Sequence, residues 1–182
     1  MKKILSLAIV LVLAMTAVSV LAEGSKTGDD IPAATVVTAP NKGNQEEEEQ
    51  VSLEIIDDTE ETAAVIQLFK DAFDAGDVLA PLPEDVRSKI PEDRTNINEM
   101  VTARFVGNVE ALEDDLKIIL QLDTPYEKDQ EVSILFGKLG DPVVWKVSEA
   151  IGTEDGKLEF TLHADEVKEY GNDPFVLAVA SA

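Results

Sequence analysis

Residues 157–163 read Lys-Leu-Glu-Phe-Thr-Leu-His, with polar and apolar side chains in strict alternation. A β-strand points successive side chains to opposite faces, so Leu158, Phe160 and Leu162 share one face of a sheet. The polar residues share the other face. This segment therefore predicts a strand that has one face in a core and the other in water.

The same two-residue rhythm recurs from Glu99 to the end of the sequence. Gly, Asn, Asp and Pro residues separate the apolar segments and supply turn chemistry. Short strands at this spacing are typical of an antiparallel β-sandwich, and their register points Val143, Trp145 and Val147 into its interior. The predicted strands are Met100–Val106, Asp115–Leu122, Glu131–Phe136, Val143–Ser148, Lys157–His163 and Phe175–Ser181.

An amphipathic helix is predicted ahead of these strands. Val51–Ile55 alternates like a strand, and Asp58 and Glu61 then have the spacing of an N-cap residue and its capping-box partner. Apolar residues within Val65–Phe73 form a broad stripe that ends before Gly76. Shorter helical segments are predicted at Pro83–Ile90 and Ala164–Tyr170.

Several residues on the outward faces of the predicted strands are apolar, which a sheet face in water does not favour. We expect the helix at Asp58–Ala75 to cover them, so that residues 51–182 form one unit. The expected fold class is mainly β: an Ig-like antiparallel β-sandwich with an N-terminal helical extension packed on it. The outward apolar residues are Met100, Val106, Ile119, Leu135, Val144 and Val176.

The first residues have the organisation of a secretory signal peptide. Lys2 and Lys3 precede the apolar segment Ile4–Met15, and Val20-Leu21-Ala22 forms a cleavage site before Glu23. Residues 1–22 are therefore predicted to be a signal peptide and the protein to be extracellular. An uncleaved membrane anchor stays open as the alternative, because the apolar segment approaches the length of a bilayer span.

The rest of the chain divides by composition. Residues 23–50 are rich in Gly, Thr, Pro and acids and are predicted to be a disordered acidic linker. A strand and helix extension follows at 51–98, and the β-sandwich domain occupies 99–182. The sequence contains no cysteine, which excludes disulfides, thiolate metal sites and the lipid-modified cysteine of a lipoprotein.

The formal net charge of −22 limits the choice of partners. Nucleic acids and anionic membrane surfaces are repelled by such a charge, because their recognition depends on Lys and Arg. We therefore expect a protein or a cell-surface polysaccharide as the partner, with no nucleic acid and no membrane insertion after signal cleavage.

The sequence favours a protein without catalytic activity. His163 is the single histidine and falls on the solvated side of its strand. This position disfavours a catalytic triad, which needs a histidine as its base. The 37 acidic residues leave a small carboxylate-dependent hydrolase as an alternative. The acidic clusters, however, lie in predicted polar loops, which do not raise the pKa of a general acid.

Two kinds of ligand site have candidate residues. Tyr126 and Tyr170 lie beside predicted turns and are the candidate ligand-binding residues of a carbohydrate-binding module, the second alternative. No cofactor is expected except Ca²⁺, which loop carboxylates bind if they converge in space. The candidate calcium ligands are Glu113, Asp114, Asp115, Asp123 and Asp155.

The signal peptide and the segment Glu23-Gly24-Ser25-Lys26-Thr27 resemble those of Gram-positive bacteria. Residues 51–182 resemble, in architecture, the uncharacterised Ig-like accessory modules of secreted Gram-positive proteins. The resemblance implies an extracellular protein and transfers no functional residue. Covalent wall anchoring is not expected, because no Leu-Pro-x-Thr-Gly signal occurs in the sequence. The sequence thus favours a secreted, non-catalytic bacterial protein that binds or scaffolds at the cell surface.

Overall fold

A computed structural model gives the fold and describes residues 34–35 and 51–182. The predicted signal peptide, residues 1–22, lies outside the described residues. So does the predicted linker, residues 23–50, apart from Ala34 and Thr35.

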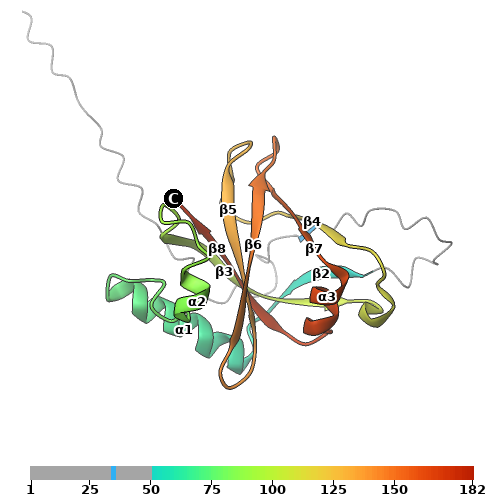
Figure 1. Cartoon of the computed structure of the whole chain (residues 1–182), viewed down its shortest axis with the longest axis horizontal. Coiled ribbons are helices and arrows are strands. Elements are labelled where there is room, and N and C mark those ends of the chain that lie inside the picture. The colour runs from blue at the N-terminus through green and yellow to red at the C-terminus, as the bar shows by residue number, and fades with distance from the viewer. Residues whose placement is uncertain (1–33, 36–50) are drawn as a thin grey trace, which may run out of the picture.

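In the described part of the chain, eight strands form one antiparallel sheet in the order β1-β4-β7-β6-β5-β8-β3-β2 (Figure 1). β1 pairs with β4 at one end of this order and comes within 8 Å of β2 at the other end, measured between Cα atoms. The sheet therefore curls into a nearly barrel-like shape. The strands are β1 Ala34–Thr35, β2 Ser52–Ile56, β3 Asn96–Val106, β4 Leu116–Leu120, β5 Glu131–Lys138, β6 Val144–Gly152, β7 Leu158–Leu162 and β8 Phe175–Ser181.

The prediction of a mainly β antiparallel fold with a helical extension packed on it is confirmed. The interior is enclosed by one continuous sheet that folds over on itself. Among the described residues, no helix combines the length and the apolar character that crossing a membrane requires. The helices are α1 Glu60–Asp74, α2 Glu84–Arg87 and α3 Ala164–Tyr170, with a 3₁₀ turn at Val109–Ala111.

Except for those of β6, the side chains that the strand rhythm assigned to the interior lie in or against the interior core. Leu158, Phe160 and Leu162 of β7 are all buried there, as predicted. Phe136 of β5 lies near the middle, with its ring centroid 5.9 Å from that of Phe160 and 6.0 Å from that of Phe175. Such aromatic pairs add to the stabilisation that burial alone provides.

A second core lies on the outer face of the sheet, under α1. Helix α1 buries Val65, Ile66 and Phe69 against strands that include β5 and β8. Leu135 and Val176, two of the outward apolar residues, are fully buried in this core. The expectation that the helix covers the outward apolar residues is therefore confirmed for these two, whereas Val144 is 50% exposed.

Trp145 belongs to this outer core and not to the interior. Its ring lies 5.4 Å from the ring of Phe69, and Val143 and Val147 pack against the same cluster. The predicted inward register of these three β6 residues is therefore wrong, although Trp145 is buried as expected. The outer face of β6 packs against an apolar core, so apolar β6 residues need not point to the interior. Alternation shows which residues share a face of the strand, but it does not show whether that face is the inner or the outer one.

The N-cap of α1 lies one residue later than predicted. The Thr62 N–H donates to the Thr59 hydroxyl at 3.2 Å, and the Thr59 N–H donates to the Thr62 hydroxyl at 2.8 Å. The prediction of Asp58 and Glu61 as the capping pair is therefore wrong. Asp58 instead accepts a hydrogen bond of 2.6 Å from the Thr102 hydroxyl, which ties the start of the helix to β3.

The predicted division of the chain into linker, extension and sandwich changes as well. Ala34 and Thr35 pair with Leu120 and Ile119, so a disordered linker is wrong for these two residues. The exposed edge of β4 offers unpaired backbone groups, and β1 satisfies some of them. β2 pairs with β3, so the predicted extension contributes a strand to the same sheet.

Candidate functional site

Tyr170, one of the two candidate ligand-binding residues, is not accessible at the surface. It ends α3 with its side chain in the interior, where it is 4% exposed. Its hydroxyl donates to the carbonyl oxygen of Phe136 at 3.3 Å, and its ring lies 5.0 Å from that of Phe175. Burial, with the negative charges of two α3 glutamates, raises the pKa of its phenol.

Tyr126 is likewise 4% exposed, so neither candidate ligand-binding tyrosine offers an exposed ring. Its backbone N–H donates to the carbonyl of Gly156 at 3.1 Å, which draws the loop and the side chain inward. Burial and then the charge of Glu99 raise the pKa of its phenol. Both residues were candidates because they lie beside predicted turns. Turn chemistry does not reveal whether a neighbouring aromatic ring points to the surface or to the interior.

The five candidate calcium ligands are not brought to one place. Asp115 precedes β4 and Asp123 follows it, so a whole strand separates them. Asp155 lies in the turn between β6 and β7, where hydrogen bonds from Lys157 and Thr153 lower its pKa to about 2. In the described part of the chain, no group of three or more acids or histidines is placed to hold a metal ion.

His163 lies on the surface at the start of α3, with 75% of its side chain exposed. Its Nδ1 is 3.0 Å from a carboxylate oxygen of Asp115. That hydrogen bond raises the pKa of the histidine. The contact links the start of β4 to the start of α3. It gives Asp115, one of the predicted calcium ligands, a histidine as its partner.

A hollow of about 390 Å³ lies where three segments of the chain meet. Small-molecule sites commonly measure about 300–1,000 Å³, so its size suits a small group or a side chain. It is lined by Thr59 and Glu61 at the start of α1, Lys138–Gly140 in the hairpin between β5 and β6, and Tyr170 and Asp173–Phe175 around the turn into β8.

Two lysines converge on Glu169 beside this hollow. Lys146 of β6 forms an ion pair of 2.5 Å with the carboxylate of Glu169, and Lys138 of β5 donates to the backbone carbonyl of the same residue. The hydrogen bond from Lys146 holds the pKa of Glu169 below its ordinary value. Cations near the last turn of a helix are favourable, because the helix dipole is negative there.

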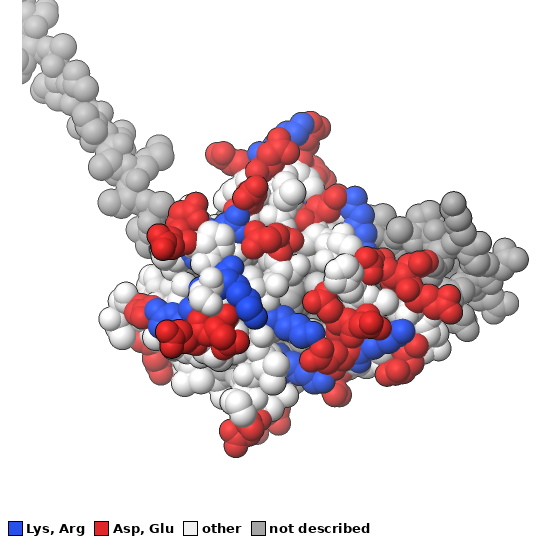
Figure 2. Space-filling view, in the orientation of Figure 1, with Lys and Arg blue, Asp and Glu red and all other residues white. Residues whose placement is uncertain are grey.

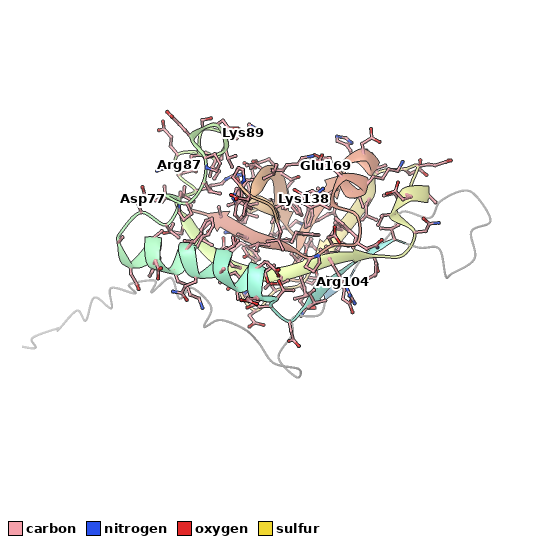
Figure 3. The ribbon with its side chains drawn as sticks, turned by 90° about the horizontal axis from the view of Figure 1, so that it is seen from below. Asp77, Arg87, Lys89, Arg104, Lys138 and Glu169 are labelled. Atoms are coloured by element: carbon pink, nitrogen blue, oxygen red, sulfur yellow. The ribbon has the colours of Figure 1, made fainter. Side chains whose placement is uncertain are left out.

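These lysines belong to a wider basic region. Figure 2 shows basic side chains in a band across the middle of one face, between α2 and α3, with acidic side chains on both sides. In Figure 3, Lys89, Lys138 and Glu169 lie along the same side of the molecule, and Arg104 lies toward the opposite side. We call this region the basic band and define it by Lys138 and Lys146, which both bond to Glu169 of α3.

Arg94 fixes the segment after α2 to the sheet. It is buried and forms an ion pair of 2.9 Å with Glu131, a hydrogen bond of 3.0 Å with the Ser133 hydroxyl and an ion pair with Glu149. A buried guanidinium requires such partners. Arg94 therefore holds the segment after α2 against β5 and β6.

No pattern in the sequence indicates the basic band. Lys138 and Lys146 are separated along the chain in a strongly negative sequence. Only the pairing of Phe136 with Lys146 across β5 and β6 brings Lys138 and Lys146 close together. The correct register of this hairpin would have been needed to find the pair.

Comparison with known proteins adds no relative: no family model, no curated protein and no solved structure matches this chain.

Proposed function

We propose that this chain is a secreted, non-catalytic bacterial protein that binds or scaffolds at the cell surface through the face carrying the basic band. The band is the observation that supports this proposal most strongly. The sequence has 15 basic and 37 acidic residues. A concentration of the minority charge beside a hollow suits a specific, charge-complementary contact.

Other parts of the proposal draw on the sequence. The signal-peptide pattern of residues 1–22 and the lack of cysteine support export from a bacterial cell. We include in the proposal a resemblance to Ig-like modules. The arrangement of antiparallel strands around one interior supports it. A carbohydrate ligand would have to use the hollow, because the rings of Tyr126 and Tyr170 are buried.

Binding of the labelled full chain to bacterial cells tests the proposal. We expect the double variant Lys138→Gln and Lys146→Gln to lose at least about tenfold in apparent affinity, because it removes two charges from the contact face. Binding should also weaken as salt is added. A parallel assay with purified cell-wall polysaccharide and with protease-treated cells identifies the class of partner.

The matched control is the double variant Lys128→Gln and Lys157→Gln, which removes two lysines that form ion pairs with Glu154 and Asp155 away from the band. It should bind like the unmodified chain. Equal binding by the band variant and the unmodified chain would contradict the proposal, provided that circular dichroism shows both to be folded.

A further inference from the structure

Strand β6 has a neighbouring strand along its whole length on one side only. Its pairing with β5 runs from Val144 to Ile151 with no shift in register, whereas its pairing with β7 is limited to Ile151 and Gly152. Figure 1 shows β6 and β7 diverging from the turn that joins them. Within the described part of the chain, residues 144–150 therefore have no strand on the β7 side.

Two hydrogen bonds at the end of β6 reveal which backbone groups face this open side. The Gly152 N–H donates to Gln130 at 2.8 Å, toward β5, and the Thr153 N–H donates to Lys157 at 2.8 Å, toward β7. Successive residues of an antiparallel strand alternate in this respect. The backbone N–H and C=O groups of even-numbered β6 residues therefore bond to β5. Those of odd-numbered residues point to the open edge, and these residues are Trp145, Val147 and Glu149.

The side chains beside the open edge have different chemistry on the two faces of the strand. Trp145 and Val147 point to the outer core, so that flank is apolar. Lys146 points to the other face, toward α3, and Val144 on the same face is 50% exposed. Glu149, on the same face as Trp145 and Val147, forms an ion pair with Arg94 that offsets its negative charge.

We propose that the open edge of β6 binds an extended, acidic segment of a partner protein, which adds a strand to the sheet. The segment pairs with the backbone groups of Trp145, Val147 and Glu149, as peptides do in strand addition. Directly opposite residues share a face. The segment therefore carries an acidic side chain opposite Lys146 and an apolar side chain opposite Val147.

This inference rests on the proposed binding function and gives it a partner chemistry. The chain as a whole is acidic, but charges beyond about 8 Å are largely screened at physiological ionic strength. The nearby basic band, with Lys146 at the edge itself, therefore makes an acidic segment the favoured partner of this edge. Seven residues of open edge span about 23 Å at about 3.3 Å per residue, enough for a peptide of about six residues.

The test uses the full chain and a peptide of about six residues in which glutamate and valine alternate. Peptide binding is expected to slow amide hydrogen exchange at Trp145, Val147 and Glu149, because the N–H groups of these residues meet no strand in the described part of the chain. A peptide of lysine and valine should bind at least about tenfold more weakly. N-methylation at alternate positions of the acidic peptide should weaken binding by a similar factor, because it removes backbone donors.

Variants locate the contact. Lys146→Glu should lose at least about tenfold in peptide affinity, whereas Lys128→Glu, with the same charge change in a distant loop, should not. Tight binding of the N-methylated peptide, or no added protection at the three outward amides, would overturn strand addition. If cells were still bound through the basic band in that case, the proposed function would stand and only this inference would fail.

Discussion

Replacing Phe69 with alanine is expected to lower the free energy of unfolding by about 3–5 kcal/mol. Phe69 is fully buried in the middle of α1 and packs edge-on against Trp145 in the outer core. Its removal leaves a cavity between the helix and the sheet that the surrounding residues fill only partly. Denaturant unfolding, followed by Trp145 fluorescence, measures the effect.

Leu68→Ala is the matched control for this change, because Leu68 is the preceding residue of the same helix and is 57% exposed. It should cost less than about 1 kcal/mol. Similar losses for the two variants would show that α1 does not pack on the sheet through Phe69, and the outer core as described would be wrong.

Replacing Gly152 with alanine is expected to destabilise the protein by about 3 kcal/mol or to prevent folding. A Cβ atom at Gly152 would lie 1.9 Å from the backbone carbonyl oxygen of Glu127. No side-chain rotation relieves this clash, because both atoms are fixed to the main chain. The loop before β5 and the end of β6 would have to separate, and the 2.8 Å hydrogen bond from Gly152 to Gln130 would be lost.

Gly76→Ala is the comparison for this second change. A Cβ atom there meets nothing within 4 Å, and only the positive φ of 89° opposes it. The expected cost is about 1 kcal/mol, from backbone strain alone. A thermal melt of both variants checks the difference, and a Gly152→Ala protein as stable as Gly76→Ala would contradict the close approach of the Glu127 carbonyl.

The alternation of apolar and polar residues predicted much of the fold. In a strand, residues two apart share a face, so this alternation shows directly that one face is buried. Leu158, Phe160 and Leu162 show this in β7, and the outward residues Leu135 and Val176 correctly indicated a covering helix. The assignment of Trp145 failed because β6 meets an apolar core on its outer face as well. Alternation cannot distinguish two cores.

The candidate site depended on contacts that no local pattern encodes. Tyr170 looked like a surface residue beside a glycine, yet α3 turns it into the interior. Lys138, Lys146 and Glu169 come from three elements and meet only because the β5–β6 register and the position of α3 bring them together. The open side of β6 follows from its short pairing with β7, which is limited to Ile151 and Gly152 and which sequence periodicity does not determine.

The binding inference depends on β6 having one bonded side and one open side, and amide hydrogen exchange of the full chain without ligand measures this directly. Lys146, Ser148 and Ala150 should exchange slowly, because their N–H groups are bonded to β5. Trp145, Val147 and Glu149 should exchange faster, so that protection alternates with a period of two along the strand. Uniform slow exchange from residue 145 to residue 150 would show that the outward side of β6 is already occupied, and would contradict an available edge.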